Sequence, residues 1–179
     1  MPSRSLNTSL NQPSVREAAF QDFFSRHRDF IKGSEYKDAR PHVYLQRTGH
    51  TPLIPDFILE PLGPNGLADV LELKLPSAPV TVTSGKHVGL SASVVRASAQ
   101  LRDYSDYFED EQNRLRVRNT YGINVFRPRM FLVIGRRGTV SPLDVRRAER
   151  DLPSVRIQTY DDILDRMTAR LKHWGRCRE

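Results

Sequence analysis

Two short aliphatic runs, each bounded by proline or glycine, constrain the fold of this chain more than any other stretch. They comprise residues 54–60 and 67–75 and are joined by Pro61-Leu62-Gly63-Pro64-Asn65-Gly66. Runs of this kind predict strands, and an Asn-Gly pair supplies the positive φ angles that a tight turn between antiparallel strands requires. The sequence therefore predicts a β-hairpin with its turn at Asn65-Gly66.

The alternation of side chains along the two predicted strands decides which polar groups meet. The leucines of the second run fall on one face, whereas Glu72 and Lys74 fall on the other, because successive side chains of a strand point in opposite directions. In the first run Phe57 and Leu59 take one face and Asp56 takes the opposite one. We therefore expect the hairpin to bring Asp56 beside Glu72 and Lys74.

Two carboxylates and one ammonium group suit phosphodiester hydrolysis. Mg²⁺ prefers oxygen ligands, takes one or two protein carboxylates, and leaves positions for water and a substrate phosphate. A metal held by Asp56 and Glu72 would polarise that phosphate and lower the pKa of bound water, and Lys74 would orient the water or stabilise negative charge. The alternative is an ordinary surface Glu–Lys ion pair, which contributes little to stability.

Three segments of the chain carry a family resemblance. They are Pro55-Asp56 with Glu72-Leu73-Lys74, residues 97–104 and residues 159–164. The first resembles the signature of PD-(D/E)XK nucleases, and the other two resemble segments of Shedu-type anti-phage nucleases. The resemblance covers most of the chain from about Val15 onward. It implies DNA cutting or nicking in defence against phage, in a homo-oligomer, and a restriction-endonuclease-like fold.

The resemblance also implies specific roles in the site. Asp56 and Glu72 bind Mg²⁺ or Mn²⁺, and the backbone carbonyl of Leu73 adds a ligand. Lys74 assists the attack of water. Gln100 projects from its helix toward the metal and hydrogen-bonds the water or Lys74, with an amide on the helix surface as the alternative interpretation.

Glu17 has two interpretations. Ser14 and Glu17 have the spacing of a capping box, at the start of an amphipathic helix predicted to reach about residue 31. Alternatively, Glu17 is an additional acidic ligand of the metal, which the resemblance implies for the first helix. Both interpretations stay open at this point.

The positive charge of the chain is concentrated in one segment. Residues 111–150 contain ten arginines against three acidic residues, a surplus that equals the formal net charge of +7 of the whole chain. Arginine suits phosphate because its planar guanidinium donates in a fork. We therefore expect double-stranded DNA as a partner. The alternative interpretation is a solvated basic face without a partner. The expected DNA contacts are Arg96, Arg102, Arg114, Arg116 and Arg118.

The order of the remaining elements predicts an α/β sandwich with a central mixed sheet flanked by helices. After the hairpin we expect a loop over residues 76–90, whose Lys86 and His87 approach DNA, and one long helix over 91–114. Residues 130–135 form an apolar run typical of a buried strand. A helix starting at Ser141-Pro142, a strand at 155–159 and a final helix complete the predicted chain.

Length and composition favour one domain in the cytoplasm. We expect a flexible leader at 1–13 and a single nuclease domain at 14–179. No apolar run approaches the roughly 20 residues of a membrane span, the start lacks a secretory signal, and Cys177 is the only cysteine. The leading hypothesis is a metal-dependent DNA endonuclease. The alternatives are a non-catalytic basic nucleic-acid-binding module and a protein-interaction domain.

Overall fold

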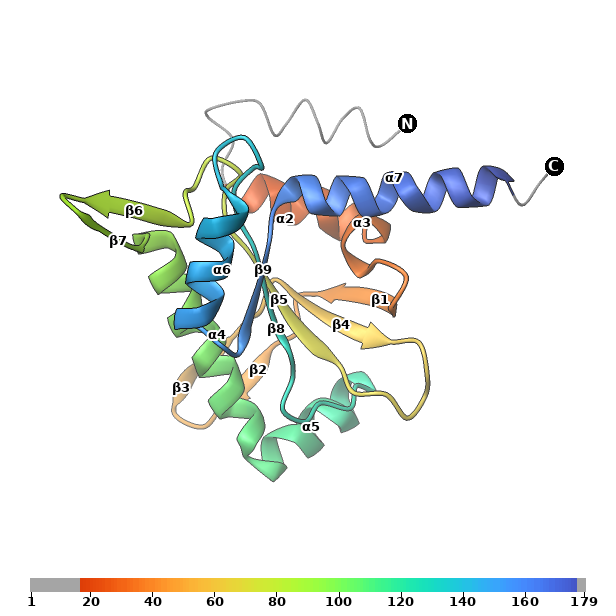
Figure 1. Cartoon of the computed structure of the whole chain (residues 1–179). Helices are drawn as coiled ribbons and strands as arrows, with labels where there is room; N and C mark the ends of the chain where they lie inside the picture. Colours follow the sequence, from red (N-terminus) through yellow and green to blue (C-terminus); the bar gives the residue numbers. More distant parts are fainter. Residues whose placement is uncertain (1–16, 177–179) are drawn as a thin grey trace.

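A mixed five-stranded sheet organises residues 17–176, the part of the chain that this computed structural model describes (Figure 1). The strand order is β1-β4-β5-β8-β9. β1, β4 and β5 pair antiparallel, whereas β5, β8 and β9 pair parallel. The bounds are Tyr36–Pro41 for β1, Phe57–Pro61 for β4, Asp69–Leu73 for β5, Met130–Val133 for β8 and Val155–Gln158 for β9.

The predicted hairpin is confirmed as the β4–β5 pair, with Phe57 opposite Leu71 and Leu59 opposite Asp69. The prediction of a tight turn at Asn65-Gly66 is wrong, because neither residue has a positive φ angle. The Gly66 N–H instead donates to the Gly63 carbonyl at 3.0 Å. A Cβ on Gly66 would lie 2.5 Å from the Cβ of Pro61, so glycine is needed here for close approach of the chain.

Helices cover both faces of the sheet, which confirms the predicted α/β architecture with a mixed central sheet. Ile58 and Val70 pack under α4, α5 and α6 on one face. Phe57 and Leu71 pack under α2, α3 and α7 on the other. The bounds are Glu17–Arg26 for α2, Asp29–Lys32 for α3, Ala92–Glu109 for α4, Glu111–Tyr121 for α5, Pro142–Asp151 for α6 and Tyr160–Arg176 for α7.

Two predicted helices are each divided in the structure. The helix expected over 91–114 ends at Glu109, because the Asp110 carboxylate accepts hydrogen bonds from the backbone N–H groups of Gln112 and Asn113 and starts a second helix. The first helix is interrupted between Arg26 and Asp29. Ser14 and the expected leader at 1–13 lie outside the described residues.

The structure contains one strand and two strand pairings that were not predicted. Charged residues and the terminal Pro41 obscure β1, which tolerates proline because it is an edge strand. β2 and β3 form a small separate sheet from Leu45–Arg47 and His50–Leu53. The expected loop at 76–90 contains a hairpin of β6, Thr81–Ser84, and β7, His87–Leu90, which projects from the molecule (Figure 1).

The final elements agree with their sequence signals. Ser141 caps α6 in a capping box with Asp144, and Pro142 occupies the first turn. β8 lies in the middle of the parallel part of the sheet, as its apolar run predicts. None of the helices in residues 17–176 combines the length and apolarity needed to cross a lipid bilayer.

Candidate active site

The open end of the β4–β5 hairpin brings together the three polar residues predicted to meet there. Asp56 directly precedes β4, Glu72 lies in β5 and Lys74 follows it. The Asp56 Oδ2 accepts a hydrogen bond from the Leu73 N–H at 2.7 Å. The Lys74 Nζ lies 3.0 Å from Glu72 Oε1. The prediction that the hairpin places Asp56 beside Glu72 and Lys74 is therefore confirmed as geometry.

Burial disfavours the ionised form of both carboxylates. It raises the pKa of Asp56 to about 6, although the Leu73 N–H and the Lys74 ammonium act in the opposite direction. Burial and the nearby charge of Asp56 raise the pKa of Glu72 to about 7, with Lys74 opposing. Glu72 is only 3% exposed. Two neighbouring buried carboxylates ionise together only when positive charge stabilises them. One ammonium group supplies that stabilisation only in part.

Lys74 lies between three carboxylates. Burial lowers the pKa of its ammonium group, but Glu72, Glu17 and Asp56 outweigh that effect and the pKa is raised overall. Glu17 Oε1 lies 3.5 Å from Lys74 Nζ. The first helix thus brings Glu17 to the site through Lys74, whereas its predicted capping partner Ser14 lies outside the described residues.

Two tyrosines that the sequence did not assign to the site support it. The Tyr104 hydroxyl lies 3.4 Å from Glu72 Oε2 and 3.2 Å from the Ile54 carbonyl. The fully buried Tyr160 donates its hydroxyl to the Lys74 carbonyl at 2.7 Å. The spacing of one helical turn between Gln100 and Tyr104 was the sequence signal that could have assigned Tyr104 to the site. For Tyr160 the signal was its position in the segment 159–164, which carried the resemblance.

A cavity of about 490 Å³ opens beside Lys74. Glu17, Arg96 and Gln100 line it together with Ser93. Gln100 is exposed and faces the same cavity as Lys74, but no hydrogen bond joins the two side chains in the described part of the chain. The structure thus brings Gln100 to the same cavity as Lys74 but without a hydrogen bond to the Lys74 side chain.

The other arginines predicted to contact DNA lie elsewhere. Arg102 lines a separate cavity near α6. Arg114 and Arg118 line a third one with Asn65, at the turn end of the hairpin, and Arg116 donates to the Gln46 carbonyl at 3.0 Å. Of the five predicted DNA contacts, only Arg96 lines the cavity beside Lys74.

The donor set fits a divalent cation bound by two carboxylates and a carbonyl. Asp56 uses Oδ2 for the Leu73 N–H, which leaves Oδ1 as a ligand. Within an antiparallel pair the N–H and C=O of one residue point to the same side, so the Leu73 carbonyl also points toward Asp56. Among residues 17–176, no three His, Cys, Asp or Glu side chains form a metal-binding group. A site with two side-chain ligands and water is the pattern that suits Mg²⁺.

Comparison with known families decides the relationship of the chain. Residues 14–164 match the family described as Shedu protein SduA, C-terminal. The chain belongs to this family. The predicted Shedu resemblance is therefore confirmed, and the matched part of this Shedu-family domain includes Asp56, Glu72, Lys74 and both site tyrosines. A comparison with curated proteins gives no match.

The raised pKa of Glu72 predicts a pH-dependent gain in stability for Glu72→Gln. The folded-state pKa lies above the unfolded value, so ionisation destabilises the fold as pH rises from about 4.5 to about 7 and remains costly above that. With chelator present, we expect Glu72→Gln to increase the free energy of unfolding by roughly 1–3 kcal/mol at pH 8 and by little at pH 4. Urea unfolding at both pH values measures this.

Glu35→Gln is the matched control, because Glu35 is exposed. It should leave the difference between pH 4 and pH 8 unchanged. A Glu72→Gln protein that is less stable than the wild type at pH 8 would contradict the assigned cost of the buried charge.

Proposed function

We propose that this Shedu-family domain is a metal-dependent DNA endonuclease of the PD-(D/E)XK superfamily, with a restriction-endonuclease-like fold and a role in defence against phage. The observation that carries the proposal is the buried pair of Asp56 and Glu72 with Lys74 beside it at a cavity. Membership of the Shedu family supports the defence role. We extend the proposal to a homo-oligomer that acts on double-stranded DNA.

Asp56 Oδ1, a Glu72 carboxylate oxygen and the Leu73 carbonyl are the proposed ligands of Mg²⁺ or Mn²⁺. When bound, the cation supplies polarisation of the scissile phosphate and a lower pKa for a coordinated water. The Tyr104 hydroxyl lies against Glu72 and fixes the orientation of its carboxylate. Glu17 is the proposed outer acidic group, acting through its ion pair with Lys74.

Lys74 is the proposed group that positions water and stabilises the negative charge that develops on the phosphate. Its side chain is 13% exposed, so the ammonium group is confined but still reaches the cavity. Tyr160 fixes the backbone of Lys74 through the hydrogen bond to its carbonyl. Gln100, which faces the same cavity, is the proposed hydrogen-bond partner of the water. The arrangement places an orienting group and a charge where hydrolysis needs them.

The chain beside the cavity is suited to approach a polyanion. No Asp or Glu occurs between Leu75 and Arg102, a stretch that contains the β6–β7 hairpin and the start of α4. The Ser91 N–H donates to the Val80 carbonyl and ties the base of the hairpin to the helix that carries Arg96. Lys86 lies at the tip of the hairpin. We therefore propose that DNA runs from the cavity along this hairpin.

Replacing Lys74 tests the catalytic assignment. We expect Lys74→Ala to retain the fold and the affinity for DNA but to lower the rate of Mg²⁺-dependent cleavage at least about 100-fold, because charge stabilisation at the phosphate is lost. Cleavage of linear and supercoiled DNA, with Mg²⁺ or with chelator, measures the rate. DNA affinity is measured separately in chelator.

Lys37→Ala is the control, because Lys37 is an exposed lysine on β1 that pairs with Glu60 at 3.5 Å. It should cleave at the wild-type rate. A non-catalytic DNA-binding module would show no Mg²⁺-dependent cleavage in any variant. Cleavage by Lys74→Ala at the wild-type rate would remove the proposed mechanism.

Charge reversal at the hairpin tip tests the DNA path. We expect Lys86→Glu to weaken duplex binding several-fold and to reduce the slope of log affinity against log salt by about 1, because each neutralised phosphate releases counterion. Arg150→Glu makes the same charge change on the exposed face of α6 and should have a smaller effect. Equal losses in the two variants would mean that net charge, not the hairpin, governs binding.

A further inference from the structure

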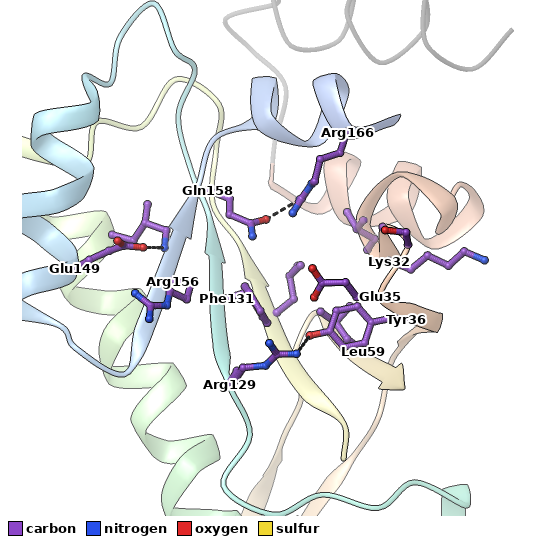
Figure 2. Close-up of a pocket in the computed structure, with 15 residues that line it drawn as sticks. Lys32, Glu35, Tyr36, Leu59, Arg129, Phe131, Glu149, Arg156, Gln158 and Arg166 are labelled. Carbon is purple, nitrogen blue, oxygen red and sulfur yellow. Dashed lines mark hydrogen bonds between the residues drawn. The ribbon is translucent and has the colours of Figure 1, made fainter. Parts of the chain in front are cut away.

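A second cavity, of about 440 Å³, lies on the sheet face opposite the carboxylates of the candidate active site (Figure 2). Its floor includes Leu59, Leu71 and Phe131 from three neighbouring strands. Leu71 precedes Glu72 in β5, so the side chains of these two residues point to opposite faces. Cavities of this size hold small organic ligands.

One end of the cavity is lined by an arginine held beside two aromatic rings. The Arg129 guanidinium lies 5.7 Å from the Phe131 ring centroid and 6.0 Å from that of Tyr36. The buried Asp69 accepts from the Arg129 Nε at 2.9 Å, and the Tyr36 hydroxyl accepts from the Arg129 Nη2 at 2.9 Å. Arg129 is thus fixed in place with its plane beside aromatic rings. Such a surface suits stacking of a planar ring.

The other end carries two arginines, and Glu149 also lines the cavity there, with its Oε1 accepting a hydrogen bond from the Ile157 N–H at 2.9 Å. Arg156 from β9 and Arg166 from α7 both line the cavity and are exposed. Arg166 donates to the Gln158 Oε1 at 2.7 Å, as Figure 2 shows. Neither arginine has a carboxylate at ion-pair distance in the described part of the chain, whereas Arg129 has Asp69. A guanidinium group without a carboxylate partner suits a phosphate.

Another carboxylate, Glu35, belongs to the end of the cavity that holds Tyr36. Glu35 projects into the cavity near Tyr36 in Figure 2, on the side away from Arg156. This acid repels phosphate but accepts hydrogen bonds from hydroxyl or amino groups. Glu35 would repel the backbone of a nucleic-acid strand, because that backbone is negatively charged along its whole length. A ligand with phosphate at one end, a planar ring and hydrogen-bond donors at the other matches the whole cavity.

We propose that this cavity binds a free mononucleotide. Arg156 and Arg166 hold its phosphate. The base lies against the surface of Tyr36, Arg129 and Phe131, and Glu35 accepts from hydroxyl or amino groups of the ligand. The site requires no metal and does not depend on the proposed nuclease activity.

Calorimetric titration of the whole chain in chelator, with ATP, AMP, adenosine and inorganic phosphate as probes, tests the proposal. We expect ATP and AMP to bind, and adenosine and phosphate to bind at least about tenfold more weakly, because each retains only one set of contacts. Arg156→Ala/Arg166→Ala should weaken AMP binding at least about tenfold through loss of two charge-assisted contacts. Circular dichroism confirms that the variants are folded.

Two controls separate this cavity from other surfaces. Arg150→Ala, on exposed α6, should bind AMP as the wild type does, and so should Asp56→Asn at the candidate active site. No binding of AMP or ATP at millimolar concentration would overturn the proposal. So would AMP binding that the double variant retains or that Asp56→Asn abolishes. Binding of duplex DNA, sensitive to the same two arginines and stronger than that of AMP, would identify a DNA surface instead and also overturn it.

Discussion

The confinement of two carboxylates at the open end of the β4–β5 hairpin is the constraint on which the rest of the site depends. Asp56 and Glu72 are withdrawn from water, and the charge of Asp56 further disfavours ionisation of Glu72. The Leu73 N–H and the Lys74 ammonium offset this only in part. Such an arrangement costs stability in the isolated protein. It becomes favourable when a ligand of high positive charge is present, and clusters of perturbed acids of this kind occur at functional sites.

The fold holds these groups in position from several directions. β5 is buried along its whole length, so Glu72 has little freedom. Tyr104 reaches Glu72 from α4, and Tyr160 reaches the Lys74 backbone from the start of α7. The site is therefore assembled from both helical layers and the sheet. The second cavity uses the other face of the same strands.

The local part of this arrangement follows from the sequence. A period of two along residues 56–59 and 71–75 is sufficient to place Asp56 beside Glu72 and Lys74, because register fixes which side chains share a face. Ser141 and Pro142 likewise define the start of α6 by short-range chemistry alone. Both predictions rest on residues that are close to one another in the sequence.

The missed features depend on contacts between distant segments. β1 is an edge strand rich in charge, and its strand conformation is set by pairing with β4 rather than by its own pattern. The arginine-rich segment looked like one surface, but Arg129 binds Asp69 and Arg136 binds Asp161, each far away in sequence. Clustering along the chain therefore does not establish clustering in space. The roles of Tyr104 and Tyr160 are hidden for the same reason.

The most direct test of a cation site at Asp56 and Glu72 is a crystal structure of the protein soaked in MnCl₂, with anomalous scattering used to locate manganese. We predict one strong peak at about 2.0–2.3 Å from a carboxylate oxygen of Asp56 and of Glu72. The same peak should be absent from crystals of Asp56→Asn. Manganese bound only elsewhere, with the two carboxylates still paired to Leu73 and Lys74 alone, would contradict the central claim.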